Sequence, residues 1–222
     1  HTHGIGIVGA ESFTSAPDRG KWQNHPGGIK ALGDLMWCAG INRFIFHRYA
    51  HQPWMDKFPG MTMGQWGTHF ERTNTWWEQA RAWMRYLARS QFLLQSGRFR
   101  GDVLFFGGEA APNGMPHRPD LKAKGFDYDA FGTDLIAALA VKDGRVVTPG
   151  GTAYRVLALP ETPWMTPALA GKVRDLVKGG ATVLARKPAK SPSLSGYPAC
   201  DDEVRTIADE VWGAADPGPA GE

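Results

Sequence analysis

The stretch GIGIVGAESFTS, residues 4–15, decides the fold class because it joins a strand pattern to a functional group. Residues 5–10 form a continuous apolar run bounded by glycine, which is typical of a buried parallel strand. Glu11 follows directly. The carboxyl end of a parallel strand is where α/β barrels carry catalytic groups. The structural alternative is that Glu11 caps a turn or pairs with Arg43.

The composition of the chain excludes two classes of partner. Its 222 residues, 42% of them hydrophobic, suffice for one large domain or two small ones. The net charge is only +3 and both signs are mixed, so the chain lacks the basic patch of a nucleic-acid-binding protein. No apolar run approaches the roughly 20 residues that a membrane span needs. We therefore expect neither a nucleic acid nor a membrane as partner.

Cysteine and tryptophan usage leaves alternatives open. Cys38 and Cys200 lie far apart and form no metal-type spacing, so one disulfide and two free thiols are both compatible with the sequence. The nine tryptophans are compatible with a sugar-binding cleft and with a tryptophan-rich core.

The first half of the chain alternates strands and helices. After the first strand, the pattern predicts a helix over 26–39 and a strand over 42–49. A long loop over 50–73 comes next, and a loop of this length is usually functional. Thr75 and Glu78 match a capping box that would open a helix of about 20 residues. We expect its inner face to carry Trp76, Ala80, Trp83, Leu87 and Leu94.

A second α/β series begins after Gly97. The expected elements are a strand at 102–106, a helix at 129–140 capped by Asp127 or Asp129, a hairpin at 145–154, a strand at 154–160, a helix from Thr166 to Gly179, a strand at 181–185 and a last helix ending at Gly213. Short parallel strands with helices between them describe a small doubly wound parallel sheet. Gly107 and Gly108 do not form a dinucleotide-binding fingerprint.

Candidate binding residues lie at the end of the second predicted strand. His47, Tyr49 and His51 alternate, so they could share one face of a strand end. Imidazole and phenol groups can donate to and accept from sugar hydroxyls. In a parallel barrel, these residues and Glu11 would meet at one rim. The alternative is a polar rim that binds no ligand.

The long loop adds further candidates. Trp54, Trp66 and His69 could wall a sugar ring, since an indole face stacks on the C–H side of a pyranose while its N–H finds an acceptor. Packing of the loop on itself is the alternative. Glu71 and Arg72 adjoin the predicted helix start, where we expect a structural role.

Three stretches carry a resemblance to a known family. The stretches are AESFTS (10–15), NRFIFHRYAHQPW (42–54) and FPGMTMGQWGTHFERTNTWWEQARAWMRYLARSQFLLQSG (58–97). Together they resemble the end of the catalytic barrel of glycoside hydrolase family 106, the α-L-rhamnosidases. The second half, including DVLFFGGEAAP (102–112) and YRVLALPETPWMTPALAGKVRDLVKGGATV (154–183), is similar to the region after that barrel.

The resemblance implies an α/β fold made of a partial (β/α)8 barrel and a small doubly wound domain. Residues 1–97 would supply the last two strands and helices of the barrel, 98–213 a flavodoxin-like accessory domain, and 214–222 a linker or disordered end. The implied activity is inverting hydrolysis of terminal α-L-rhamnosides. Glu11 would be one of two catalytic carboxylates, the base rather than the acid, with its partner outside this chain.

The resemblance also implies a calcium ion and a rhamnose-containing glycan as substrate. No EF-hand-like string exists here, and Asp127 with Asp129 are better explained as helix caps. Most calcium ligands would therefore come from outside the chain. Such substrates are usually extracellular, so the resemblance favours a secreted or periplasmic protein. The oligomeric state is left open.

Two alternatives to this function stay open. The layout also resembles family 42 β-galactosidases, in which a barrel precedes a flavodoxin-like domain. A different class is a non-catalytic remnant that binds carbohydrate or a partner. The start HTHG and the tail GAADPGPAGE indicate a piece of a longer protein. We expect this piece alone to be inactive, and its first half to be less stable than its second.

Overall fold

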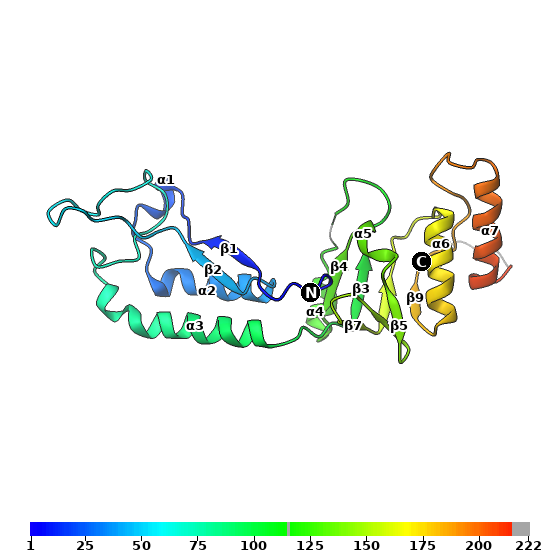
Figure 1. Ribbon diagram of the computed structural model, residues 1–222, viewed down its shortest axis with the longest axis horizontal. Helices are drawn as coiled ribbons and strands as arrows, with labels where there is room; N and C mark the ends of the chain where they lie inside the picture. Colours follow the sequence, from blue (N-terminus) through cyan, green and yellow to red (C-terminus); the bar gives the residue numbers. More distant parts are fainter. Residues whose placement is uncertain (115, 215–222) are drawn as a thin grey trace. The chain divides into compact units, whose positions relative to one another are not determined.

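The computed structural model describes residues 1–114 and 116–214, so the predicted end segment lies outside it from residue 215. The chain divides into two compact units. The N-terminal unit is Gly6–Arg98, and the C-terminal unit begins at Phe99 and includes His1–Ile5 (Figure 1).

The N-terminal unit is a parallel strand pair with its helices. Its elements are β1 (Gly9–Ser12), α1 (Pro17–Gly20), α2 (Pro26–Cys38), β2 (Arg43–Phe46), the 3-10 helix η1 (Trp77–Ala80) and α3 (Arg81–Ser96). β1 and β2 run parallel, with Gly9 opposite Arg43 and Ser12 opposite Phe46. α2 and α3 lie on one side of this pair (Figure 1). Helix 26–39 is confirmed, with Pro26 in its first turn.

The first strand is shorter than predicted and is not buried. Ile5 and Ile7 are exposed, and pairing starts only at Gly9. The reason lies in Asn42, whose side-chain amide accepts from the Val8 N–H at 2.8 Å and donates to the Gly6 carbonyl at 2.9 Å. A side chain thus satisfies the backbone that a strand ladder would otherwise use.

The predicted capping box is wrong. The chain enters α3 through the short helix η1, and neither η1 nor α3 has a side-chain cap. Backbone carbonyls take that role, since the Trp77 N–H donates to Asn74 and the Gln79 N–H donates to Trp76. On the inner face, Trp83 and Leu87 are buried as expected. Leu94, at the far end of the helix, is exposed.

The core of the N-terminal unit is aromatic. Its buried members are Phe13, Ile29, Phe70, Trp83 and Leu87. Phe46 stacks on Phe70 with ring centroids 4.6 Å apart and on Trp83 at 5.7 Å. Part of the tryptophan content is therefore core packing.

The C-terminal unit contains two sheets. Its elements are β3 (Val103–Phe106), α4 (Pro119–Ala123), β4 (Tyr128–Phe131), α5 (Thr133–Ile136), β5 (Ala140–Lys142), β6 (Arg145–Val147), β7 (Ala153–Tyr154), β8 (Val156–Ala158), α6 (Pro167–Lys178), β9 (Thr182–Leu184) and α7 (Ala199–Trp212). The larger sheet has the order β4-β3-β8-β9, and all its pairs are parallel. β5, β6 and β7 form an antiparallel sheet.

The predicted helix over 129–140 is wrong, and so is its cap by Asp127 or Asp129. Residues 128–131 are strand β4, because they pair with β3 from Val103↔Tyr128 to Phe106↔Phe131. Only the four residues of α5 are helical. The expected hairpin over 145–154 is present as β6 and β7, and β5 adds a strand that the sequence pattern did not indicate.

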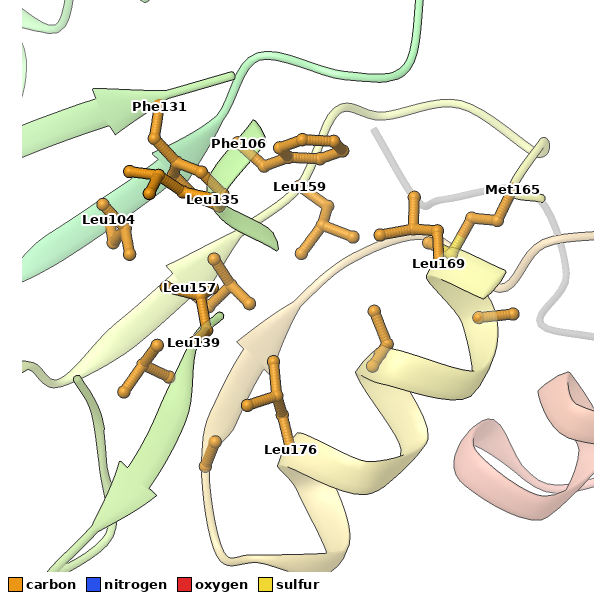
Figure 2. Close-up of a cluster of buried hydrophobic side chains, with 14 of the residues drawn as sticks. Leu104, Phe106, Phe131, Leu135, Leu139, Leu157, Leu159, Met165, Leu169 and Leu176 are labelled. Atoms are coloured by element: carbon orange, nitrogen blue, oxygen red, sulfur yellow. The ribbon is translucent and has the colours of Figure 1, made fainter. Parts of the chain in front are cut away.

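The strands and helices at the end of the chain agree closely with the sequence pattern. Thr166 caps α6 by accepting from the Leu169 N–H, and Gly179 is the C-cap. β9 and α7 also lie where predicted. Figure 2 shows the core between the large sheet and α6, where Leu104, Leu157 and Leu176 are buried. α7 packs against α6.

Candidate functional site

Two strand ends in the N-terminal unit bring chemical groups together. β1 and β2 are parallel, so their carboxyl ends lie at the same edge. Glu11 is the third residue of β1, opposite Ile45, and His47 directly follows β2. The Glu11 Oε1 lies 3.8 Å from the His47 Nδ1. Of the seven side chains singled out from the sequence, these two lie within 4 Å of each other.

Glu11 is held on one side and open on the other. Phe13 adopts a left-handed backbone, and the chain then places the Thr14 hydroxyl 2.6 Å from the Glu11 Oε1, to which it donates. The Glu11 side chain is nevertheless 60% exposed. Arg43, the partner in the structural alternative, lies opposite Gly9 instead. The carboxylate is therefore fixed by a turn and accessible to a ligand.

The end of the long loop returns beside the end of β2. The Arg48 N–H donates to the Thr68 carbonyl at 2.8 Å, and the Phe70 N–H donates to the Arg48 carbonyl at 2.9 Å. The Thr68 N–H also donates to the His47 carbonyl at 3.1 Å. These bonds place residues 67–71 against the strand end, although they lie about twenty positions further along the chain.

The returning loop creates a buried polar cluster, which consists of Arg48, Thr68, His69 and Glu71. Arg48 donates from Nη2 to the Gly64 carbonyl at 2.7 Å. Its Nε and Nη1 atoms, the Thr68 hydroxyl and both ring nitrogens of His69 are buried with no hydrogen-bond partner within the described residues. Burial, followed by the positive charge of Arg48, lowers the pKa of His69 and so favours its neutral imidazole.

Sequence reasoning identified only part of this cluster. His69 was expected on a sugar-facing wall, yet it is 4% exposed and packs edge-on against Trp22 at 4.7 Å between ring centroids. Arg48 and Thr68 were missed. The available signal was an arginine next to a strand-end histidine, but a lone arginine is usually a solvated residue.

Glu71 anchors the base of the long loop. Its carboxylate accepts from the Gln52 amide at 2.8 Å and from the Thr73 N–H at 2.9 Å. Gln52 in turn accepts from the Arg72 Nε at 2.8 Å and donates to the Pro59 carbonyl at 2.9 Å. Glu71 and Arg72 thus have structural partners, as the sequence indicated.

The remaining candidates lie on the surface of the loop. Tyr49, Trp54 and Trp66 are exposed, the last two by about half of their surface. His51 is exposed and its carbonyl accepts from the Met61 N–H. Because β2 ends at Phe46, Tyr49 and His51 do not continue a strand face with His47. The loop, rather than strand alternation, determines where they lie.

The C-terminal unit has a pocket of about 500 Å³ at the end of β3. Glu109 lines it, and its carboxylate accepts from the Thr166 N–H at 2.9 Å and the Thr166 hydroxyl at 2.5 Å. Lys172 also lines it and donates to the carbonyls of Ala137 and Leu139. Both charges are thus engaged in holding α6 in place.

The described residues do not fit a calcium site. Calcium takes six to eight oxygen ligands, but no group of three or more acidic, histidine or cysteine side chains gathers anywhere in residues 1–114 and 116–214. Asp129 accepts from the Tyr154 hydroxyl at 2.5 Å and contacts His1, and Asp127 pairs with Lys122. Neither carboxylate is available as part of a cation cage.

The geometry is that of a parallel α/β protein with a solvent-accessible carboxylate at a strand end, a class to which many glycosidases belong. Comparison with known proteins is more specific. The sequence profile of glycoside hydrolase family 106, described as alpha-L-rhamnosidase, matches residues 1–218. The chain belongs to this family.

Two similar proteins cover nearly the whole chain. A rhamnosidase from Novosphingobium sp. PP1Y has a solved structure that matches 95% of this chain with a TM-score of 0.77 and 31% identity. A protein of Formosa agariphila named "Putative beta-glucuronidase" is 50% identical over 213 residues, or 96% of this chain. The chain spans only about a fifth of each relative, 20% and 18% of their lengths.

These comparisons confirm the suspected family and the glycosidase class. The family implies a carbohydrate as substrate. Within the part of the chain that the structure describes, none of the helices has the length and apolar character to cross a membrane.

Proposed function

We propose that this chain is part of an enzyme that hydrolyses terminal α-L-rhamnosides with inversion, and that Glu11 is one of its two catalytic carboxylates. The observation that carries the proposal is the position of Glu11. It lies at the carboxyl end of β1, beside the parallel strand β2, with its side chain 60% exposed. This is the strand end at which (β/α)8 barrels carry catalytic groups.

The exposed strand pair supports a partial barrel. Parallel sheets are normally buried on both faces, but no residue of β1 or β2 is fully buried. Ile45 on β2 is 56% exposed. In our proposal β1 and β2 are the last two strands of a (β/α)8 barrel, and the other strands belong to a longer protein. The relatives, about five times as long as this chain, are consistent with that.

In our proposal Glu11 is the base of the catalytic pair. Inverting glycosidases need two carboxyl groups about 6.5–9.5 Å apart, one to protonate the leaving oxygen and one to activate water. The Thr14 hydroxyl donates to the Glu11 Oε1 at 2.6 Å, which would hold the carboxyl group in place beside the water that a base activates. Its acid partner would come from another strand of the barrel.

The sugar would contact the surface next to Glu11. His47 is adjacent, and the exposed loop side chains Tyr49, His51, Trp54 and Trp66 are the further candidates. Aromatic faces can stack on the pyranose, and imidazoles can bind its hydroxyls. His69 would not touch the sugar, because its ring is buried. It would support the site only as a member of the buried polar cluster.

Three features of the whole enzyme belong to the same proposal. The strand order β4-β3-β8-β9, second-first-third-fourth along the chain, supports a flavodoxin-like accessory domain. The calcium implied by the family would take its ligands from outside this chain. Export would bring the enzyme to its glycan substrate.

The test is the substitution Glu11→Gln in the longer enzyme, with calcium supplied and an aryl α-L-rhamnoside as substrate. We expect a loss of about 10²–10⁴-fold in kcat, because glutamine keeps the shape and cannot accept the proton. Glu78→Gln, an exposed glutamate of η1, is the matched control and should retain activity. NMR of the first product formed would report whether the anomeric configuration inverts.

Other substrates make the proposal falsifiable. An aryl β-D-glucuronide is included because of the name of the Formosa agariphila relative, and an aryl β-D-galactoside because of the similar layout of family 42 enzymes. If the enzyme cleaved either of these glycosides and not the rhamnoside, the proposed substrate would be wrong. Normal activity of Glu11→Gln would refute the role of Glu11. Binding of rhamnosides without hydrolysis would favour a non-catalytic function.

A further inference from the structure

The His47 ring has a defined orientation toward Glu11. Its Nδ1 lies 3.8 Å from the Glu11 Oε1, and its side chain is only 20% exposed. Its Nε2 is buried and has no hydrogen-bond partner among the described residues. At its Nδ1 the ring thus meets the candidate catalytic carboxylate. An element other than a hydrogen bond to Nε2 must hold the ring in place.

The returning loop comes close to His47 at Gly67. A Cβ atom at Gly67 would lie 2.7 Å from the His47 Cδ2 and 2.3 Å from the His47 carbonyl oxygen. Both separations are too short for any side chain to be present. The loop backbone thus packs directly on the imidazole ring.

Gly67 is also tied to the segment after β1. Its N–H donates to the Ser15 carbonyl at 2.9 Å. Ser15 follows Thr14, the residue whose hydroxyl donates to Glu11. Gly67 therefore contacts two segments of the candidate site. One is the segment that follows β1, the strand of Glu11, and the other is the segment that begins with His47 after β2.

We propose that Gly67 is a positioning residue, whose missing side chain allows the loop to lock the His47 imidazole against the Glu11 carboxylate. The inference rests on the proposed function, since it gives Gly67 a role only if Glu11 is catalytic. A bulkier residue at position 67 would move the His47 Nδ1 away from the Glu11 Oε1, or it would break the hydrogen bond between the N–H of residue 67 and the Ser15 carbonyl. Either shift moves the base relative to its water, and such misplacement is costly to the rate.

A matched pair of substitutions tests this role. Gly64 lies in the same loop and has nearly the same left-handed backbone, with φ +80° against +79° for Gly67. A Cβ atom at Gly64 would meet open space. Gly67→Ala and Gly64→Ala therefore place alanine at nearly the same left-handed φ, and they differ in the contact with His47.

We expect Gly67→Ala in the longer enzyme to lower kcat about 100-fold with little change in KM, as loss of alignment at the reacting group would. Gly64→Ala should stay close to the unsubstituted enzyme. Equal losses in both variants would overturn the proposal, because strain alone would then explain them. Near-UV circular dichroism of the tryptophan-rich core reports whether each variant folds.

His47→Ala keeps the proposal testable even if Gly67→Ala does not fold. We expect His47→Ala to lower kcat. We expect Gly67→Ala to cost less kcat in the His47→Ala background than on its own, since the ring contact is then gone and only the close approach to the carbonyl oxygen of residue 47 remains. Normal kcat in His47→Ala, with Glu11→Gln inactive, would overturn the inference and leave the proposed function intact. Normal activity in Glu11→Gln would overturn the proposed function itself.

Discussion

The two units of the chain bury their strands to very different degrees. In the C-terminal unit, Leu104 on β3 and Leu157 on β8 have no exposed surface, because four parallel strands and α6 enclose them. In the N-terminal unit, β1 and β2 form only one pair, and Ile45 is largely exposed. The contrast teaches that the four-stranded sheet of the C-terminal unit covers its own central strands, whereas the two-stranded sheet of the N-terminal unit leaves its strands partly exposed.

The units also differ in what they bury. The C-terminal core is aliphatic and aromatic, with Tyr154 as its largest fully buried side chain. The N-terminal unit buries Arg48, Thr68, His69 and Glu71 next to its candidate site, at a cost in free energy where polar atoms have no partner. A buried polar group without a partner calls for a physical explanation, and a role in catalysis is one of those known.

The largest loss of stability is expected when a core side chain of the four-stranded sheet is truncated. Leu157→Ala should destabilise the C-terminal unit by about 2–5 kcal/mol, because it leaves a cavity in a closed core. The equivalent truncation Ile45→Ala, on the exposed strand pair, should cost less than about 0.5 kcal/mol in the 222-residue chain. Hydrogen exchange of peptides covering β8 and β2 measures the two units separately.

The same substitution in the longer enzyme sharpens the comparison. If neighbouring barrel strands cover Ile45, as we propose, Ile45→Ala should cost clearly more there than in the 222-residue chain. Equal costs in both would show that no neighbour covers this face. A large cost already in the 222-residue chain would break the contrast between the two units.

A smaller effect is expected at the helix starts. Thr166→Ala should destabilise α6 by about 1 kcal/mol, since it removes the hydroxyl that accepts from Leu169 and donates to Glu109. Thr166→Ser keeps the hydroxyl and serves as control. Thr75→Ala should stay within about 0.5 kcal/mol, because the cap expected at Thr75 is not formed. Hydrogen exchange of α6 and α3 measures both, and comparable losses would contradict the assigned caps.

The smallest effect concerns pH. Burial raises the pKa of Asp129 above its ordinary value, although the Tyr154 hydroxyl opposes this. The folded state therefore binds this proton more tightly, so the contribution to stability is full in acid and is lost as pH rises through the raised pKa. Asp129→Asn should remove that decline in the thermal stability of the C-terminal unit.

Asp134 provides a control of opposite sign. Its hydrogen bond with His3 lowers the pKa of the Asp134 carboxyl. Its contribution is present above the ordinary aspartate pKa and is lost as pH falls. Asp134→Asn should therefore reduce the fall in Tm that is measured as the pH is lowered through the acidic range. If both asparagine variants changed the pH dependence in the same direction, the assignment for Asp129 would be wrong.

The part of the candidate site that depends only on the pairing of β1 and β2 was predictable from the sequence. Glu11 and His47 each come after an apolar strand pattern, and parallel pairing brings such residues to one edge. Gly67 and the buried polar cluster were not predictable, because they reach the site through hydrogen bonds between residues twenty or more positions apart. Tyr49 and His51 were predicted on one face only because β2 was expected to extend further.

The sequence by itself determined the features that depend on neighbouring residues. These include the α/β alternation and helix α6 with its Thr166 cap, Pro167 start and Gly179 end. Their signals lie within a few positions of one another, so local propensity and hydrogen bonding suffice. The carboxylate at the end of the first strand was visible for the same reason.

Only the tertiary structure decided the features that depend on distant pairing. Residues 128–131 became a strand because β3 offered a parallel partner, although Asp127 and Asp129 resemble helix caps. Strand β1 begins only at Gly9, because the Asn42 side chain forms hydrogen bonds with the backbone of Gly6 and Val8 before it. Backbone groups must find partners wherever the fold places them, and that requirement outweighs local preference.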